Sequence, residues 1–136
     1  MTSDFPPRKA FGDDERDAID EVSTYYRYSD ADPGYNGIFQ ERFEEDLAKF
    51  YGKGEAAAVN SGTNALYIAL CALNLREGRE VIVSPVTDSG TVHAILAANL
   101  VPVVADAAPG SYNTGLEQVR DCATDKTAAV MLVHTA

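Results

Sequence analysis

The fold is decided by the stretch Ala57-Ala58-Val59-Asn60-Ser61-Gly62-Thr63-Asn64-Ala65-Leu66-Tyr67-Ile68-Ala69-Leu70. It predicts a short apolar strand, a tight turn built on Ser61, Gly62 and Thr63, and then a helix. Such a turn directs backbone N–H groups and short hydroxyls to one point above the helix N-terminus, where an anion is favoured. Gly62 permits close approach, and Thr63 and Asn64 add side-chain donors. A plain helix cap formed by Ser61 or Thr63 would explain the same residues.

Length, charge and cysteine content narrow the class of protein. The chain has 136 residues, 46% of them hydrophobic, which is enough for one core. A net charge of −10 argues against nucleic-acid binding, which uses a basic face. The opening residues Met1–Lys9 are polar, and no apolar run reaches the ~20 residues of a membrane helix. We therefore expect a cytoplasmic protein with no nucleic-acid or membrane partner. Cys71 and Cys122 form no disulfide framework, and Cys71 is predicted to be buried and inert.

Residues 1–38 are predicted to form an acidic, tyrosine-rich N-terminal arm. After a loose start over 1–7, a helix is expected over about 14–26, with its carboxylates on a solvated face. Four tyrosines lie close together and offer flat amphipathic area suited to an interface, although packing on the arm's own domain is equally compatible. They are Tyr25, Tyr26, Tyr28 and Tyr35.

Residues 39–136 carry the pattern of an α/β domain. A helix over about 38–51 is predicted to lay one aromatic stripe on a core before Gly52 and Gly54 stop it; the stripe contains Phe39, Phe43, Leu47 and Phe50. Further helices are expected over about 64–75, 87–99 and 115–122, the last opened by a capping box from Thr114 to Glu117. Their inward side chains are predicted to be Leu66, Ala69, Leu70, Leu73, Ile95 and Leu96.

Strands are expected over 57–59, 81–83, 101–105 and 128–133, alternating with those helices. This alternation indicates a mostly parallel sheet with helices on both faces. Ligands of such sheets bind beyond the carboxyl ends of the strands. The candidate site residues all fall at those ends: Ser61 to Asn64, Thr87 to Thr91, Asp106 and His134.

Four ordered blocks resemble the opening of the DegT/DnrJ/EryC1/StrS sugar aminotransferases, which are fold-type-I pyridoxal-phosphate (PLP) enzymes. The blocks are Phe43–Gly52, Asn60–Leu66, Gly78–Pro85 and Val101–Asp106, and the resemblance runs from about Phe39 to the last residue. It implies that 39–136 is the N-terminal, incomplete part of the PLP-binding large domain. It also implies that Ser61, Gly62, Thr63 and Asn64 contact the cofactor phosphate, because the family's SGT turn does so.

Two further positions are predicted to bind the cofactor, and both need comment. Family members commonly place at position 88 an aromatic residue that stacks on the cofactor ring, and Asp88 cannot stack. It would bond a donor on cofactor or substrate, or cap the following helix. His134 matches the histidine that ends the corresponding strand in the family. His93 is expected to be a packed or surface residue, and Asp106 to cap a loop.

PLP chemistry needs a lysine that holds the cofactor covalently and an acidic group at the ring nitrogen. In the family both come after the strand that ends this sequence. The lysines present are Lys9, Lys49, Lys53 and Lys126, and none matches the family's position, so all four are interpreted as surface residues. Alone, the chain is expected not to catalyse.

Three interpretations of this truncated pattern remain open. In the leading one, the chain is the phosphate-binding subunit of a split aminotransferase, and a second polypeptide supplies the lysine in a hetero-oligomer. The composite would transfer an amino group to a keto-sugar or similar carbonyl. In the second, the chain is a non-catalytic homologue that binds and stabilises a full-length aminotransferase. In the third, it is a fragment of a longer reading frame. A dehydratase or epimerase reaction has less support, because relatives perform other PLP reactions on sugars.

Overall fold

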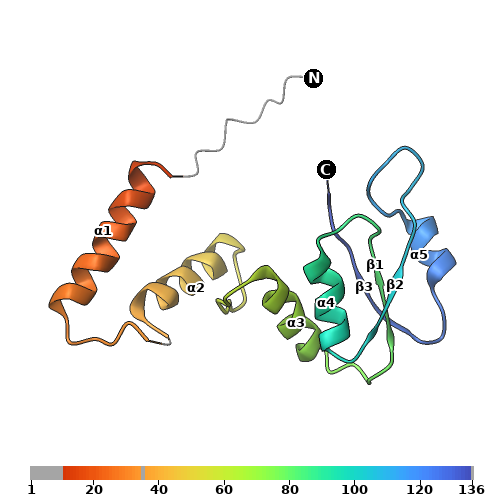
Figure 1. Cartoon of the computed structure of the whole chain (residues 1–136), viewed down its shortest axis with the longest axis horizontal. Helices are drawn as coiled ribbons and strands as arrows, with labels where there is room; N and C mark the ends of the chain where they lie inside the picture. The colour runs from red at the N-terminus through yellow and green to blue at the C-terminus, as the bar shows by residue number, and fades with distance from the viewer. Residues whose placement is uncertain (1–10, 35, 136) are drawn as a thin grey trace. The chain divides into compact units, whose positions relative to one another are not determined.

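The computed structural model describes residues 11–34 and 36–135, so the predicted loose start, Lys9 and Tyr35 lie outside the described residues. The chain forms two compact units, one ending at Ala58 and the other beginning at Val59. Figure 1 labels the helices and strands along the chain. The boundary between residues 38 and 39 inferred from the sequence stays a prediction. Among the described residues, no helix is both long and apolar enough to cross a bilayer; the cytoplasmic location likewise stays a prediction.

The first unit contains two helices, α1 (Asp13–Tyr28) and α2 (Ile38–Phe50), which confirms both helices expected there. The N–H of Gly12 donates to Glu15 Oε2 over 2.6 Å and so opens α1. The first turn of α1 is acidic, as the positive end of the helix dipole favours. Gly52 and Gly54, with φ of +80° and +94°, turn the chain away after α2.

Neither helix of this unit buries a residue. Phe43 is 56% exposed and Phe50 is 82% exposed, so the prediction that the aromatic stripe lies on a core is wrong. The physical reason is that α1 contacts only the Phe39 end of the stripe, and the described part of this unit has no sheet that could cover Phe43 and Phe50. Tyr28 is also largely exposed, at 80%.

Side chains near the start of α2 connect it to α1. Arg42 Nη1 lies 2.7 Å from Glu21 Oε1, and the Arg42 guanidinium lies 5.3 Å from the centre of the Phe39 ring. The rings of Tyr25 and Tyr26 pack against Phe39 at centroid distances of 5.5 and 5.9 Å. Two of the clustered tyrosines therefore pack within their own unit.

The second unit is the α/β part of the chain. It begins with helix α3 (Gly62–Ala72) and then alternates strands with helices, confirming the predicted class. The elements that follow are β1 (Glu80–Val83), α4 (Ser89–Ala97), β2 (Val101–Val104), α5 (Leu116–Cys122) and β3 (Thr127–Met131). The strands form a parallel sheet in the order β2-β1-β3.

The central strand β1 explains why this unit has a core. Its residues Val81, Ile82 and Val83 are at most 1% exposed, because β2 and β3 flank the strand. Val81 and Val83 face α3 and α4 in a cluster that also contains Leu70, Ala94, Ile95 and Leu100. The chain moves from β1 to β2 and then back past β1 to β3, and α4 and α5 lie on opposite faces of the sheet (Figure 1).

The predicted strand over 57–59 does not form. The N–H of Ala58 donates instead to Glu44 Oε1 over 2.7 Å. Two successive alanines have low β-propensity, so the carboxylate satisfies this backbone group where no strand partner does. The sheet therefore has three strands among the described residues, one fewer than the sequence pattern predicts.

Several burial predictions for the helices of the second unit are wrong. Leu73 is 59% exposed, Leu96 is 53% exposed, and Cys71 is exposed as well. Ala69, also predicted to point inward, is exposed too. Leu73 is the C-cap of α3, and the other three residues lie in α3 or α4, apolar helices that pack only one side on the described core, so the other side faces outward. The predicted capping box is also absent, because α5 starts one residue later and the Thr114 hydroxyl donates to the Asp106 carbonyl over 3.2 Å.

Candidate functional site

The start of α3 carries unsatisfied backbone donors. Ser61 is the N-cap, and its Oγ accepts from the N–H of Asn64 over 3.2 Å. The Asn64 side chain donates to the Asn60 side chain. Within the described residues, the N–H groups of Gly62 and Thr63 have no hydrogen-bond partner. The capping interpretation of Ser61 is thus confirmed, and two amides stay open to an anion in front of the helix.

The start of α4 is built in a similar way. Asp88 is its N-cap, and its Oδ1 accepts from the N–H of Gly90 over 2.8 Å. The hydroxyls of Thr87 and Thr91 lie 2.7 Å apart, and Thr91 is only 5% exposed. Asp88 therefore caps its helix, which is one of the two roles considered for it.

The two helix starts lie against each other at Thr63 and Gly90. A Cβ placed on Gly90 would collide with the Thr63 Oγ1, so only a glycine allows this approach. A hollow of about 560 Å³ opens beside the contact, a volume in the range of ligand pockets. Its lining comes from both helices: Gly62, Thr63, Ala65, Leu66, Asp88, Gly90 and Thr91.

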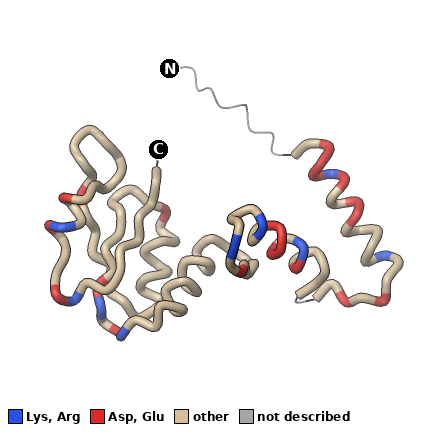
Figure 2. Tube along the Cα trace, turned by 180° about the vertical axis from the view of Figure 1, so that it is seen from behind, with Lys and Arg blue, Asp and Glu red and all other residues tan. Residues whose placement is uncertain are grey.

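The electrostatics of the hollow differ from one side to the other. Residues 56–75, which include all of α3, carry no charged side chain although the chain as a whole is acidic, and Figure 2 shows this uncoloured run. Asp88 contributes the one carboxylate among the lining residues. An anion is therefore favoured at α3, and a hydrogen-bond donor is favoured beside Asp88.

The carboxyl ends of β1 and β3 are bonded to each other. Ser84, 2% exposed, accepts from the N–H of Val133 over 3.1 Å. The Thr135 hydroxyl donates to the Val86 carbonyl over 3.0 Å. These bonds hold the residues on either side of His134, whose own side chain is exposed. His134 lies at the expected edge of the sheet but does not line the hollow.

The structure brings Gly62, Thr63 and Asp88 into one hollow, while Ser61 and Asn64 form the cap beside it. Two lining residues, Ala65 and Leu66, were not among the candidates that the sequence indicated. Gly90 and Thr91 also line it and belong to the Thr87–Thr91 string, which the sequence indicated by its place at a strand end.

The two remaining polar candidates are structural. His93 is an exposed residue of α4, as expected. Asp106 accepts from the N–H of Ala107 over 2.8 Å, which agrees with the loop-capping role expected for it.

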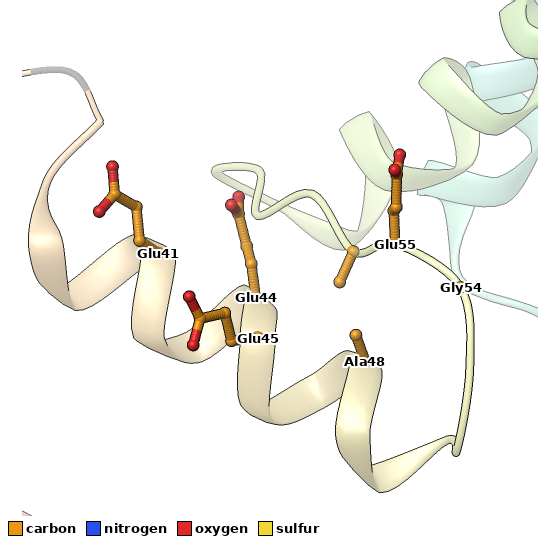
Figure 3. A pocket seen from close by; sticks show the side chains of 7 residues that line it. Glu41, Glu44, Glu45, Ala48, Gly54 and Glu55 are labelled. Atoms are coloured by element: carbon orange, nitrogen blue, oxygen red, sulfur yellow. The ribbon is translucent and has the colours of Figure 1, made fainter.

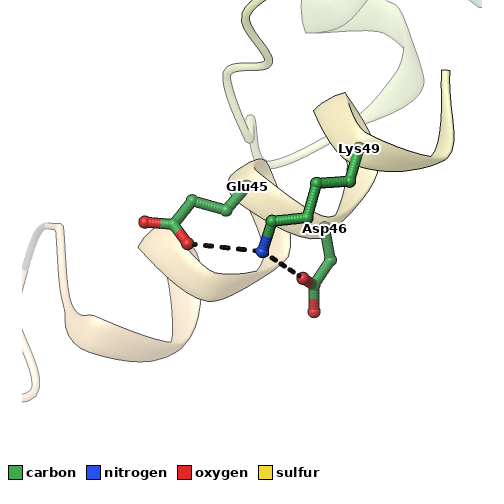
Figure 4. Close-up of polar contacts among 3 residues, drawn as sticks. All are labelled: Glu45, Asp46 and Lys49. Atoms are coloured by element: carbon green, nitrogen blue, oxygen red, sulfur yellow. Dashed lines mark hydrogen bonds and ion pairs between the residues drawn. The ribbon is translucent and has the colours of Figure 1, made fainter. Parts of the chain in front are cut away.

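The lysines of the described residues are placed as surface groups. In α2, Lys49 Nζ lies 3.1 Å from Asp46 Oδ1 and 3.6 Å from Glu45 Oε2 (Figure 4). The hydrogen bond to Asp46 and the nearby carboxylate charges raise the pKa of Lys49, so its amine stays protonated and is a poor nucleophile. Lys53 is exposed, and Lys126 is exposed directly before β3, at the amino ends of the strands.

A second hollow, in the first unit, gathers four carboxylates, from Glu41, Glu44, Glu45 and Glu55 (Figure 3). Hydrogen bonds from the Ala58 N–H and from Gln40 lower the pKa of Glu44. Like charges of this kind disfavour a phosphate. In the described part of the chain, no group of three or more histidines, cysteines and carboxylates is arranged to hold a metal ion.

Comparison with known proteins identifies the family. The model of the DegT/DnrJ/EryC1/StrS aminotransferase family matches residues 16–136. The chain is 33% identical, over 96% of its length, to a dTDP-4-dehydro-2,6-dideoxy-D-glucose 3-dehydratase from Saccharopolyspora spinosa, of which it covers 29%.

Among solved structures, the chain is similar to an aminotransferase from Psychrobacter cryohalolentis, with a TM-score of 0.81 and 30% identity over 97% of this chain and 32% of that one. NtdA from Bacillus subtilis, solved with the cofactor PMP bound, has a TM-score of 0.76 and 28% identity over 88% of this chain and 27% of NtdA. The chain thus spans about a third or less of these relatives. It belongs to the DegT/DnrJ/EryC1/StrS aminotransferase family.

Proposed function

We propose that this chain supplies the phosphate-binding part of a PLP-dependent aminotransferase site that acts on a keto-sugar or similar carbonyl. In this proposal a second polypeptide supplies the lysine that holds the cofactor, and the two form a hetero-oligomer in the cytoplasm. One observation supports the binding role above all others. The unpartnered N–H groups of Gly62 and Thr63 open the uncharged helix α3 beside a hollow of ligand size.

The residues of the hollow fit the cofactor's chemistry. Its phosphate would accept from the N–H groups of Gly62 and Thr63 and from the Thr63 hydroxyl. Leu66 and Ala65 add apolar surface suited to a ring. The carboxylate of Asp88, on the α4 side, would repel the phosphate and accept from a donor on cofactor or substrate. The hollow therefore favours one orientation, with the phosphate at α3.

When bound, PLP withdraws electrons from the substrate carbon that reacts. This chain's part in the reaction would be binding and orientation, because its residues fix the phosphate end while Asp88 fixes a donor at the other end. Holding and moving the proton at the reacting carbon requires an amine. The sequence of the second unit contains one lysine, Lys126. It precedes β3 and so lies at the amino ends of the strands, whereas the candidate site residues lie at the carboxyl ends. This placement supports a lysine from another polypeptide.

The phosphate role is tested on the 136-residue chain itself with inorganic phosphate as the probe. Two-dimensional amide NMR during a phosphate titration should show saturable shifts at Gly62 and Thr63. Thr63→Ala should weaken the binding severalfold. Thr24→Ala is the matched control, because Thr24 is an exposed threonine of α1. Shifts that are absent, or unchanged in Thr63→Ala, would contradict the proposal.

The shared site is tested by absorbance of the purified chain alone and with a co-expressed, lysine-bearing family polypeptide in the presence of PLP. We expect the visible-region band of covalently held PLP in the mixture and none in the isolated chain. A band in the isolated chain would show that one of its own lysines holds the cofactor. A complex whose band and activity are unaffected by Thr63→Ala would instead support a non-catalytic homologue that stabilises its partner.

A further inference from the structure

The two outer strands of the sheet present different edges. β2 and β3 each pair with β1 on one side only. In a strand of a parallel sheet, successive residues direct their N–H and C=O groups alternately to the two sides. The hydrogen bonds to β1 therefore reveal which residues of each outer strand direct these groups outward.

The edge formed by β2 lacks a donor. Val101 and Ala105 donate to carbonyls of the central strand segment, at Arg79 and Val83, over 2.9 and 3.0 Å. Pro102, the next residue after Val101, therefore lies at an outward position, and proline has no N–H. A four-residue strand with proline at an outward position is poorly suited to further pairing, as is usual for a strand at the edge of a sheet.

The edge formed by β3 keeps its donors. Since Val83 accepts from β2, the adjacent Ile82 directs its N–H and C=O groups to β3. Ile82 lies opposite Val130, so it bonds to the flanking residues Ala129 and Met131, which therefore face β1, as does Val133, the donor to Ser84. Val130 and Leu132 are the alternate residues and direct their N–H and C=O groups outward. Their side chains are 45% and 56% exposed. No charged residue occurs over 128–133, so nothing protects this edge from pairing.

We propose that the outer edge of β3 is where the second polypeptide adds a strand to the sheet. This inference rests on the proposed function, since it names the surface at which the partner joins. The occupant is inferred from the comparison with the Psychrobacter aminotransferase: the match covers 32% of that chain, and in the proposed function a second polypeptide supplies the lysine-bearing part. β3 is the edge suited to receive it, because β3 keeps both outward donors while β2 has proline at one of its two outward positions.

The chemistry of this surface describes the segment that fits it. The incoming strand pairs with the N–H and C=O groups of Val130 and Leu132 and brings β-branched or other apolar side chains against the exposed Val130. Both existing pairs are parallel. A further parallel strand brings its carboxyl end beside His134, at the edge of the sheet where ligands bind.

The experiment uses the full 136-residue chain, with the part of the Psychrobacter aminotransferase that lies beyond its match as a separately expressed probe. Co-purification measures assembly, without PLP. Val130→Pro removes an outward N–H without removing a bond to β1, and it should abolish assembly. Val104→Pro is the matched control, because it removes an outward N–H from β2 and should leave assembly intact. Equal loss in both variants, or no assembly of the unmodified chain, would overturn the proposal.

Amide hydrogen exchange of the unmodified complex needs no variant. Exchange at Val130 and Leu132 should slow by about tenfold or more on assembly, while exchange at Val104 stays unchanged. Unchanged exchange at Val130 would overturn the proposal. The phosphate titration of the unmodified chain separates this inference from the proposed function. If the chain assembles and Val130 is protected but no phosphate binds, the docking edge stands and the cofactor role fails.

Discussion

The two units of the chain are stabilised by different kinds of contact. From Val59 onward, a buried strand is flanked by two others and covered by apolar side chains of α3 and α4. Up to Ala58, neither helix buries a residue, and the contacts are an ion pair, aromatic edges and a carboxylate that accepts a backbone N–H. The difference teaches that the second unit has the means to fold from its own residues. In the first unit, the aromatic stripe of α2 is left largely exposed at Phe43 and Phe50.

The largest effect on stability is expected when one large apolar side chain is shortened in each unit. Ile95→Ala, at a side chain with 0% exposure, should lower the free energy of unfolding by about 2–5 kcal/mol. Phe43→Ala, at a side chain 56% exposed, should change it by less than about 0.5 kcal/mol. Denaturant unfolding followed by circular dichroism measures both. Similar losses in the two variants would show that the stripe of α2 is buried in solution.

A glycine pair tests how closely α3 and α4 must approach. Gly90→Ala forces a methyl group against Thr63 and should cost about 1–3 kcal/mol, with weaker phosphate binding. Gly62→Ala is the matched control, because a Cβ there meets nothing within 4 Å. Thermal unfolding of both variants provides the measurement. Comparable losses would mean that backbone conformation, and not the contact with Thr63, demands the glycine.

The cap of α4 offers a smaller test within the same unit. Asp88→Ala removes the acceptor of the Gly90 N–H and should destabilise the protein by about 0.5–2 kcal/mol. Asp88→Asn keeps an acceptor oxygen and should retain most of the stability, while it removes the charge that faces the hollow. Calorimetric unfolding gives the stability, and a PLP titration of the complex gives the effect of the charge. If the Asp88→Asn variant is destabilised as much as the Asp88→Ala variant, the negative charge of Asp88 is what stabilises the start of α4.

The smallest effect is expected in the first unit, at Glu44. Its folded-state pKa is lowered from 4.5, first by the Ala58 N–H and then by Gln40. A lowered pKa means that the contact adds stability above the unfolded-state value and loses it as the pH falls through the folded-state value. The amide shift of Ala58 should therefore titrate below pH 4.5. In Glu44→Gln the shift should lose this dependence, and a midpoint above the ordinary value would contradict the structure.

The sequence predicts the elements better than their burial. Among the described residues, periodicity located the five helices and the three strands, because local propensity and apolar spacing act over a few residues. It failed at Ala57–Val59, where a distant carboxylate competes for a backbone N–H. It also failed at Cys71 and Leu96, because an apolar side chain indicates that a face needs cover, not that cover is present in the described structure.

The candidate site was predictable in part for a similar reason. The Ser61–Asn64 turn carries its own chemistry, so its residues could be named from the sequence. The contact between Thr63 and Gly90 joins positions 27 residues apart (90 minus 63), and no local pattern reports it. The sequence placed Gly90 in a string at a strand end, but its contact with Thr63 is visible only in the structure.

That same contact has a consequence for how the family can vary. A side chain at position 90 and a hydroxyl at position 63 exclude each other, so the two positions should covary among relatives that keep this packing. Where residue 63 is threonine, position 90 should remain glycine. An alanine at 90 should appear together with a residue at 63 that has given up the phosphate contact proposed here, so sequence drift at α4 would be limited by ligand binding at α3.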